Sequence, residues 1–346
     1  MIARGGEFRG IDGAGRGAFS VGQGPRDDTS LSSCAVISSR PHDSQRLPSP
    51  DADRAKEPVT AFALALVLVA AGLHAIWNLC AKRAGGGLPF VWLVGAIICS
   101  LYVPVVIGYC WWRRPDLSGT ALAWIAGSGV LKTGYSLLLQ RAYRSGDFSL
   151  IYPLARGTGP LLSTLAAIAF LGERPTLLAL AGGLVIVAAI FFLTDGARLF
   201  HQDRAHLRVA FRYGLLSGLF IASYTIWDRH GVHALGIPPV LYDAGTAAMV
   251  LILVTPFALP RWTEVSRHWR EHQKYLWGMA LLSPLAYVLV LTAMSFTPVS
   301  YVAPAREVSI VIGAFIGSRY LKEADGHRRL WAALAMAAGV IALALG

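Results

Sequence analysis

Two ionisable residues, Arg306 and Glu307, stand next to each other inside an apolar stretch, 299–323, that is long enough to cross a bilayer. Ionisable groups are costly in hydrocarbon, so they normally face a charged partner or a water-filled cavity. Pro304 precedes them and removes one helix hydrogen bond, and a GxxxG motif beginning at Gly313 offers a face for a second helix. The pattern favours a polar-solute site in a loosened membrane helix; a purely architectural ion-pair network is the alternative.

Further charges are predicted inside apolar segments, and the balance among them is positive. Lys132 lies near the middle of its segment, where its side chain reaches neither membrane surface easily, and Arg156 is also inside. Against them stand Glu307 and, nearer the segment ends, Asp228 and Asp243. We therefore expect an anionic or zwitterionic substrate. Its carboxylate, phosphonate or phosphate would meet Lys132 and Arg156, since arginine offers a planar fork and lysine a point charge.

The buried charges also need partners within the protein. Arg306 and Glu307 are adjacent, so on a helix they point about 100° apart and are not expected to pair with each other. Arg306 is instead a candidate to bind carbonyl groups freed by Pro304. Glu307 is a candidate to pair with Lys132 or Arg156.

Uncharged residues complete the predicted substrate site. His74 and Asn78 are four residues apart and share one face of the first apolar segment. Trp77, Tyr135 and Tyr224 are the aromatic candidates, because they fall near polar residues of the same segments. The alternative role of the polar pair is interhelical hydrogen bonding, and that of the aromatic residues is packing or a membrane-interface belt.

The elements that position these residues come in two related sets. Residues 150–173 repeat the pattern of 299–323 after a constant shift of 150 residues. The shift pairs Arg156 with Arg306, Leu171 with Leu321, and Glu173 with Glu323. Lys132 has no charged counterpart, because the equivalent place in the second repeat holds Leu282 and Ser283, and this asymmetry favours a functional role for Lys132. The two glutamates close their helices and are expected at the membrane interface.

Composition places the chain among membrane proteins. Hydrophobic residues make up 55% and charged residues 15% of the 346 residues, and the mean hydropathy is +0.51. The net charge of +11 fits loops beside anionic lipid, and no basic-aromatic module predicts a nucleic-acid partner. The four cysteines have no metal-ligand spacing and are expected to pack, and we expect no bound metal.

Apolar segments of about 20 residues, enough for roughly 30 Å of hydrocarbon, recur along the chain. They predict ten membrane spans: 59–81, 88–111, 120–143, 147–171, 175–194, 211–231, 238–259, 275–297, 299–320 and 327–345. A polar connector, 195–212, separates a first repeat, 59–195, from a second, 211–346. Because each repeat has an odd number of helices, the two insert with opposite orientation. The predicted fold is an all-α polytopic membrane protein with a 5+5 inverted repeat, a recurring design of secondary transporters.

Residues 1–58 differ in composition from the rest of the chain. They are rich in Gly, Arg, Ser, Asp and Pro, lack the apolar core of a signal peptide, and are expected to be disordered. Val59 directly precedes the first apolar run, and a valine-type codon can start a bacterial gene. A misassigned gene start is therefore one explanation of the tail, which an intact-mass measurement on the native protein would test.

The chain resembles EamA-type members of the drug/metabolite transporter superfamily in runs that keep their order. These are HAIWNLCAKRAG after an apolar start, ARGTGPLL followed by LGE, and PVSYVAPAREVSIVIGAF followed by LKE. The resemblance covers nearly all of 59–346, and the second half is also similar to a branch described as phosphonate-utilisation-associated membrane proteins. It implies a ten-helix carrier with a central cavity in a bacterial inner membrane. The family moves amino acids, metabolites or drugs, so the resemblance does not fix the substrate.

The predicted function is a gradient-driven carrier of a small anionic or zwitterionic metabolite. No catalytic motif or nucleotide-binding loop appears, so we expect neither an enzyme nor a cofactor. Glu307, Asp243 and His74 are candidates for proton or ion coupling. A multidrug exporter of lipophilic cations and a non-transporting scaffold are the alternatives. The sequence leaves open whether the protein is a monomer or a homodimer.

Membrane orientation is left open by two conflicting arguments. Ten spans put both termini on one side, and the family resemblance implies a cytoplasmic N-terminus. The most basic loops, 198–212, 261–274 and 319–329, would then lie outside. The positive-inside rule instead places those loops in the cytoplasm.

Overall fold

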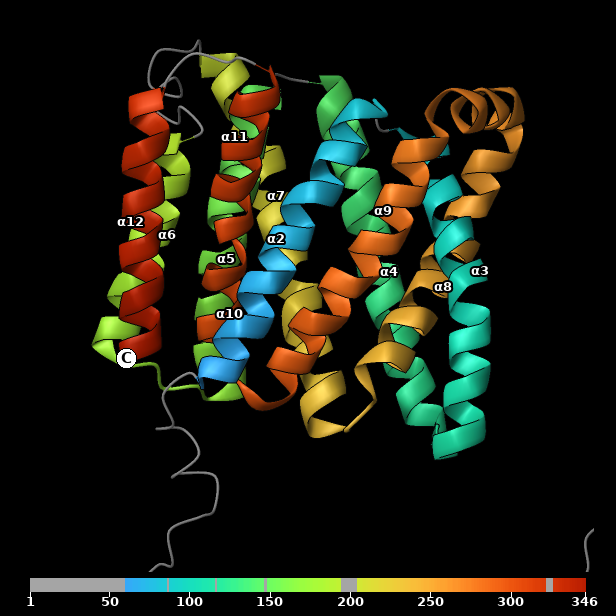
Figure 1. The fold of residues 1–346 in the computed structure, drawn as a ribbon, viewed down its shortest axis with the longest axis horizontal. Helices are drawn as coiled ribbons and strands as arrows, with labels where there is room; N and C mark the ends of the chain where they lie inside the picture. The colour runs from blue at the N-terminus through green and yellow to red at the C-terminus, as the bar shows by residue number, and fades with distance from the viewer. Residues whose placement is uncertain (1–59, 86, 116, 146–147, 194–203, 322–325) are drawn as a thin grey trace, which may run out of the picture. The chain divides into compact units, whose positions relative to one another are not determined.

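The computed structural model describes residues 60–85, 87–115, 117–145, 148–193, 204–321 and 326–346, so the predicted tail, 1–58, lies outside the described residues. Within those ranges the chain is helical and contains no strand (Figure 1). The elements are α2 (Ala61–Arg83), α3 (Leu88–Arg113), α4 (Gly119–Ser145), α5 (Phe148–Leu171), α6 (Leu177–Leu193), α7 (Arg204–Arg229), η2 (His230–Ala234), α8 (Pro239–Ala258), η3 (Leu259–Arg261), α9 (Trp262–Phe296), α10 (Val299–Arg306), α11 (Val308–Leu321) and α12 (Gly326–Leu345).

The helices are apolar enough for a bilayer. Among the described residues, five stretches have the length and composition to cross a membrane: Ala61–Ala81, Leu88–Arg113, Gly119–Leu139, Leu154–Leu171 and Pro239–Phe296. Shorter apolar helices cover Leu177–Phe192 and Leu330–Leu345. Helices satisfy their own backbone hydrogen bonds, which is the requirement for a chain that lies in hydrocarbon.

Two segments that the sequence predicted as polar connectors are helical. α7 begins at Arg204, inside the predicted connector 195–212, and α9 begins at Trp262, inside the predicted basic loop 261–274. α9 departs from helical geometry at His272 (φ −127°, ψ 19°), where its polar first part meets its apolar second part. Hydropathy marks only the part of a helix that lies in hydrocarbon, whereas the helix itself continues into the polar region.

Helices of the first half pack against helices of the second half (Figure 1). α2 packs against α9 and α11, and α7 packs against α4 and α5. α3 packs against α8, and α6 against α12. Because the two halves bury their helices in each other, side chains from both halves reach a shared interior.

The closest backbone approach of this kind joins α6 to α12. A Cβ atom on Gly182 would lie 2.6 Å from the carbonyl oxygen of Gly339, and a Cβ on Gly339 would lie 2.8 Å from the carbonyl oxygen of Gly182. By contrast, a Cβ on Gly313 would meet only the Cβ of Ala75, at 3.9 Å, which is an ordinary contact. α2 is thus in ordinary contact with Gly313, and the tighter glycine contact in the described residues joins α6 to α12. Gly317, the second glycine of the predicted motif, is outside the residues whose surroundings the structure describes.

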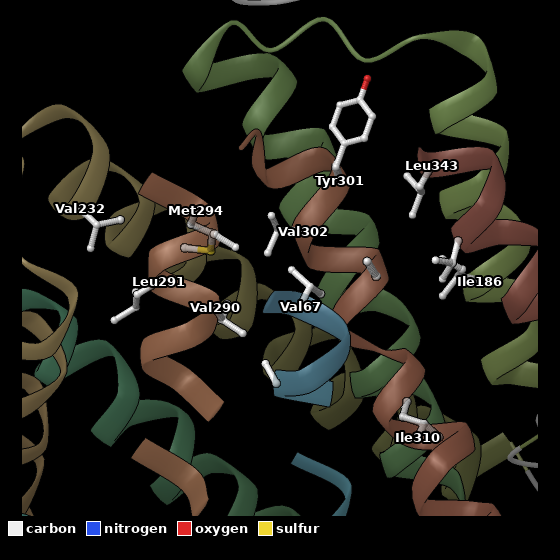
Figure 2. Packing of buried hydrophobic residues seen from close by; sticks show 14 of the residues in the cluster. Val67, Ile186, Val232, Val290, Leu291, Met294, Tyr301, Val302, Ile310 and Leu343 are labelled. Atoms are coloured by element: carbon white, nitrogen blue, oxygen red, sulfur yellow. The ribbon is translucent and has the colours of Figure 1, made fainter. Parts of the chain in front are cut away.

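A buried apolar cluster holds α10 in the middle of these helices (Figure 2). It includes Val67 of α2, Ile186 of α6, Leu291 of α9, Val302 of α10 and Leu343 of α12. All eight residues of α10 are buried. Apolar burial of this extent fixes the position of α10 and of the charged residue at its end.

The repeat-related fourth helices differ in continuity. α10 ends at Arg306, and Glu307 (φ −73°, ψ −7°) separates it from α11, in agreement with the break predicted near Pro304. α5, which carries the related glycine- and proline-rich stretch, is one continuous helix. Gly157 and Gly159 of α5 pack directly against side chains of α6 and α7.

Candidate functional site

Ionisable side chains gather in the helix interior in two groups. The arginine cluster consists of His74, Arg156, Arg306 and Glu307. The lysine–aspartate cluster consists of Lys132 and Asp228 with the hydroxyl groups of Ser128, Tyr242 and Tyr287. The carboxylates of Glu307 and Asp228 are 1% and 0% exposed, whereas the side chains of Arg156 and Lys132 keep 14% and 17%. The cations thus reach accessible space that the carboxylates do not.

In the arginine cluster, two guanidinium groups share one carboxylate. A terminal nitrogen of Arg156 lies 3.1 Å from Oε2 of Glu307, and Nε of Arg306 lies 3.5 Å from Oε1. The other terminal nitrogen of Arg156 lies 3.2 Å from Nε2 of His74. A guanidinium only donates hydrogen bonds, so Nε2 of His74 accepts, and the imidazole is neutral with its proton on Nδ1. The cluster therefore carries one excess positive charge.

The contact between Arg306 and Glu307 corrects the expectation that these neighbours do not pair. That expectation assumed a continuous helix, whereas α10 ends at Arg306 and the backbone at Glu307 leaves helical geometry. The expected pairing of Glu307 with Arg156 is confirmed. The alternative pairing of Glu307 with Lys132 is not formed, because Lys132 pairs with Asp228.

Arg306 is the less satisfied of the two arginines. The residue is 7% exposed, and its Nε makes no hydrogen bond. Within the described part of the chain, the 3.5 Å contact with Glu307 is the one polar contact of its guanidinium group. No hydrogen bond joins Arg306 to the carbonyl groups near Pro304 in those residues, so the predicted capping role is not seen there. Its fork of donors is left for another acceptor.

In the lysine–aspartate cluster, by contrast, the carboxylate is saturated. Oδ1 of Asp228 accepts hydrogen bonds from Ser128 at 2.5 Å and from Tyr242 at 2.9 Å. Oδ2 accepts one from Tyr287 and lies 3.1 Å from Nζ of Lys132. One cation and one carboxylate balance, so this cluster has no net charge.

Aromatic rings surround the Lys132 ammonium and connect the clusters. Nζ lies 4.1 Å from the ring centroid of Tyr287 and 5.9 Å from that of Tyr224, which is cation–π geometry. Tyr224 meets Tyr135 edge to face, with centroids 6.0 Å apart. Tyr224 is also within electrostatic reach of charged groups of both clusters.

The remaining predicted site residues divide into two kinds. Trp77 packs its ring edge to face on His74, with centroids 4.4 Å apart, so it borders the arginine cluster. Asn78 donates a hydrogen bond to the His74 carbonyl of its own helix, 2.9 Å away, which satisfies its amide locally. The structure thus brings His74 and Trp77 to the cluster, while the Asn78 amide is directed to the α2 backbone.

Asp243 forms a smaller polar site beside the lysine–aspartate cluster. The residue is 8% exposed, and its Oδ2 accepts a 2.6 Å hydrogen bond from Tyr102. Among the described residues it forms no ion pair, although Lys132 is close enough to interact with it electrostatically. Asp243 is thus a buried carboxylate whose one direct partner there is a neutral hydroxyl group.

Asp228, Tyr287, Ser128 and Tyr102 were not predicted as site residues. Asp228 was placed near the end of the span 211–231, whereas the π-helix η2 continues α7 to Ala234 and the Asp228 side chain is fully buried. An acid followed by Arg229 near the end of an apolar helix was the available signal. The neutral hydroxyl groups of Tyr287, Ser128 and Tyr102 gave no such signal in the sequence.

Further contacts join the two halves outside the clusters. The carboxylate of Glu173 accepts hydrogen bonds from the backbone N–H groups of Val299, at 2.7 Å, and Ser300, at 2.9 Å, at the electropositive start of α10. Glu173 was expected only to close its own helix. The indoles of Trp124 and Trp227 stack 4.1 Å apart, and each donates its N–H to the other's backbone carbonyl, at 2.8 and 2.7 Å.

Long apolar helices that gather ionisable side chains in a shared interior define a polytopic membrane protein with an internal polar site. The EamA-like transporter family matches residues 61–195 and again residues 210–345. The chain therefore belongs to the EamA-like transporter family, within the drug/metabolite transporter superfamily, as its motifs indicated. It is an integral membrane transporter.

The comparison with solved structures extends to the fold. A structure titled "Crystal structure of protein" is similar with a TM-score of 0.65 at 16% sequence identity, over 82% of this chain and 98% of that chain. At this identity the likeness shows the fold alone. No match was found among proteins of curated function, and no comparison identifies the phosphonate-associated branch.

Proposed function

We propose that the protein is a secondary transporter of a small anionic or zwitterionic metabolite, and that the anionic group of the substrate binds at Arg306. The observation that carries this proposal is the excess positive charge of the arginine cluster, where the buried guanidinium group of Arg306 and the half-buried one of Arg156 share the carboxylate of Glu307. A buried cation without full compensation is costly, and an anionic ligand relieves that cost. The planar fork of Arg306 fits a carboxylate or phosphonate in bidentate geometry.

Lys132 has a smaller direct role in anion binding than the sequence suggested. Its charge is compensated by Asp228, 3.1 Å away, and its ammonium rests on the Tyr287 ring. Arg156 lies at the edge of the site, since it already contacts Glu307 and His74. Arg306 is therefore the first anchor for the substrate, and Arg156, His74, Trp77 and Tyr224 are its surroundings.

The proposed mechanism is alternating access by two inverted repeats of five spans each, 59–195 and 211–346. In this scheme α10 and α11 form one broken span, which brings the total to ten. The packing of first-half helices on second-half helices supports it, because rocking of one repeat against the other opens such a shared interior from either side. The Trp124–Trp227 pair and the Glu173 contact would close the end that α10 starts from.

Gradient coupling and the bacterial inner membrane complete the proposal. Glu307 and Asp243 are the buried carboxylates proposed for proton coupling, because each can change charge inside the protein. The protein would then need neither a nucleotide nor a cofactor.

Thermal stabilisation of the purified protein in detergent tests the proposal. Panels of small carboxylates, phosphonates and amino acids would be compared with a panel of lipophilic cations. A bound ligand at about 100 times its dissociation constant adds about 2.7 kcal/mol to the free energy of unfolding. Arg306→Gln should abolish stabilisation by anionic groups, whereas the exposed Arg267→Gln serves as the matched control. Stabilisation by anions that persists in Arg306→Gln would refute the assignment.

A lipophilic-cation exporter of the same fold is the second candidate. The rings of Tyr224 and Tyr287 around the Lys132 ammonium favour it, because they show that a cation can be held in this interior. Stabilisation by lipophilic cations alone would support this function. A protein that responds to neither panel would fit a scaffold.

A further inference from the structure

The Lys132 ammonium is held in the way that a protein holds an ammonium ligand. A carboxylate oxygen of Asp228 lies 3.1 Å from Nζ, and the rings of Tyr287 and Tyr224 lie 4.1 and 5.9 Å from it. A carboxylate together with aromatic faces is the usual environment of a bound organic ammonium group. The side chain is 17% exposed, so it is the accessible member of a pair whose acid is 0% exposed. Lys132 thus fills a preformed cation subsite from its own chain.

We propose that Asp228, Tyr287 and Tyr224 form the ammonium subsite of a zwitterionic substrate, and that Lys132 occupies this subsite only while the carrier is empty. The proposal rests on the proposed function, because the carboxylate of the same substrate binds at Arg306. The Tyr224 ring lies 5.9 Å from Nζ of Lys132, and Tyr224 is within electrostatic reach of charges of both clusters. A molecule that carries an ammonium group and a carboxylate a few atoms apart meets both.

Asp243 gives the displaced Lys132 ammonium a second partner. It is a nearly buried carboxylate with the Tyr102 hydroxyl group as its direct partner among the described residues, and it already interacts electrostatically with Lys132. α4, which carries Lys132, packs against both α7, which carries Asp228, and α8, which carries Asp243. A lysine side chain has the rotatable bonds to move between two such acids. Substrate binding therefore exchanges the partner of Lys132 from Asp228 to Asp243.

The charge balance of the two clusters and Asp243 favours a zwitterion over an anion. The cations of this set are Lys132, Arg156 and Arg306, and its carboxylates are Asp228, Asp243 and Glu307. Arg229 is also buried but lies outside the set, where it donates to the Met294 carbonyl and interacts electrostatically with Glu173. Three positive and three negative groups leave no net charge, with His74 neutral. A zwitterion preserves this neutrality in the loaded carrier, whereas a simple anion leaves an uncompensated charge in a low-dielectric interior. When the substrate leaves, Lys132 returns to Asp228, and the empty carrier is neutral as well.

Binding of matched ligands to the full chain in detergent tests the proposal. The probes are L-amino acids, each beside its deaminated acid and its decarboxylated amine, for example L-phenylalanine, 3-phenylpropionate and 2-phenylethylamine. We expect the wild type to bind an amino acid at least about 30-fold more tightly than either analogue, because losing one partner of a buried charge pair has an effect of this size. Equal binding of the acids and the amino acids would overturn the ammonium subsite and leave the proposed function standing. If no anionic probe binds, both the ammonium subsite and the proposed function are refuted.

Variants separate the subsite from a merely structural ion pair. In Lys132→Met the subsite is vacant, so the amines should gain binding that the wild type lacks. Ser128→Ala is the matched control, since it removes a hydrogen bond from Asp228 but keeps Lys132 in place and should show no gain. Asp243→Asn should weaken amino-acid binding at least about tenfold, because displaced Lys132 loses its partner. Unchanged amine binding in Lys132→Met, or unchanged amino-acid binding in Asp243→Asn, contradicts the exchange.

A neutral double variant covers the case in which Lys132→Met does not fold. Lys132→Met with Asp228→Asn leaves no unpaired charge at the subsite, so folding is preserved more easily. This variant should bind 3-phenylpropionate about as well as L-phenylalanine. Retained preference for the amino acid in the double variant would show that another group binds the ammonium.

Discussion

The lysine–aspartate cluster and the arginine cluster differ in how fully their buried charges are compensated. Asp228 is surrounded by three hydroxyl donors and one lysine, so every acceptor position is used and the charge is balanced. Glu307 serves two arginines, and one of them, Arg306, has no hydrogen bond to its Nε. The saturated cluster already holds an ammonium group, that of Lys132, whereas the cluster with surplus donors is prepared for an anionic ligand. The difference locates the anion-binding half of the site.

Removal of the shared carboxylate should have the largest effect. Glu307→Gln leaves two buried guanidinium groups without a counter-ion, and we expect a loss of about 3–5 kcal/mol in the free energy of unfolding. Denaturant or thermal unfolding in detergent measures it. The exposed Glu264→Gln is the control and should change stability by less than about 0.5 kcal/mol. A loss below about 1 kcal/mol in Glu307→Gln would mean that water already compensates the arginines.

Removal of the saturated carboxylate should cost somewhat less. Asp228→Asn leaves Lys132 unpaired, but that side chain is partly exposed and can be hydrated, so we expect a loss of about 2–3 kcal/mol. Adding Lys132→Met should restore part of it, with a coupling energy of about 1–3 kcal/mol in a double-mutant cycle. Strictly additive effects would show that the pair does not interact in solution.

Removal of a single hydroxyl donor from Asp228 or from Asp243 should have a smaller effect than removal of a carboxylate. Tyr287→Phe takes one hydrogen bond from Asp228 but keeps the ring under Lys132, so a loss of about 1–2 kcal/mol is expected. Tyr102→Phe removes the direct partner of Asp243 and should cost a similar amount. Unfolding midpoints of the two variants, measured side by side, test whether the two acids depend equally on hydroxyl donors.

The smallest effect is expected at Asn78. Its amide is hydrogen-bonded to the backbone of its own helix, so Asn78→Ala should change the free energy of unfolding by about 0.6 kcal/mol or less. The same variant should leave ligand-induced stabilisation intact. A clear loss of ligand response would bring Asn78 back into the substrate site.

Sequence reasoning located the buried cations but not their arrangement. Lys132, Arg156 and Arg306 stand out in apolar segments, and Pro304 marks the broken helix. The partner of Lys132 could not be predicted, because the pairing with Asp228 depends on the packing of α4 against α7, which no local pattern in the sequence records. Tyr287 and Tyr242 were also hidden, since a neutral hydroxyl group in an apolar helix looks like any other packing residue.

The pairing of Arg306 with Glu307 shows the same limit from another side. Periodicity assumes a continuous helix, and the backbone at Glu307 does not follow one. Hydropathy likewise identified the apolar core of α7 and α9 but not their polar ends, because a helix is stabilised beyond the hydrocarbon by its own hydrogen bonds. Predictions from the sequence therefore hold for features that a local pattern determines and fail for features that tertiary contacts determine.

The Glu173 contact also has a mechanical consequence. Glu173 lies just after the end of α5 and accepts hydrogen bonds from two backbone N–H groups in the first turn of α10. Arg156 of α5 forms an ion pair with Glu307, the residue that follows α10. α10 is thus tied to the same element of the other half at both of its ends. Sliding of α10 along α5 would break one of these ties. Movement of the end that carries Arg306 away from α5 would first require the Arg156–Glu307 ion pair to open, so this ion pair acts as a latch on the substrate-binding arginine.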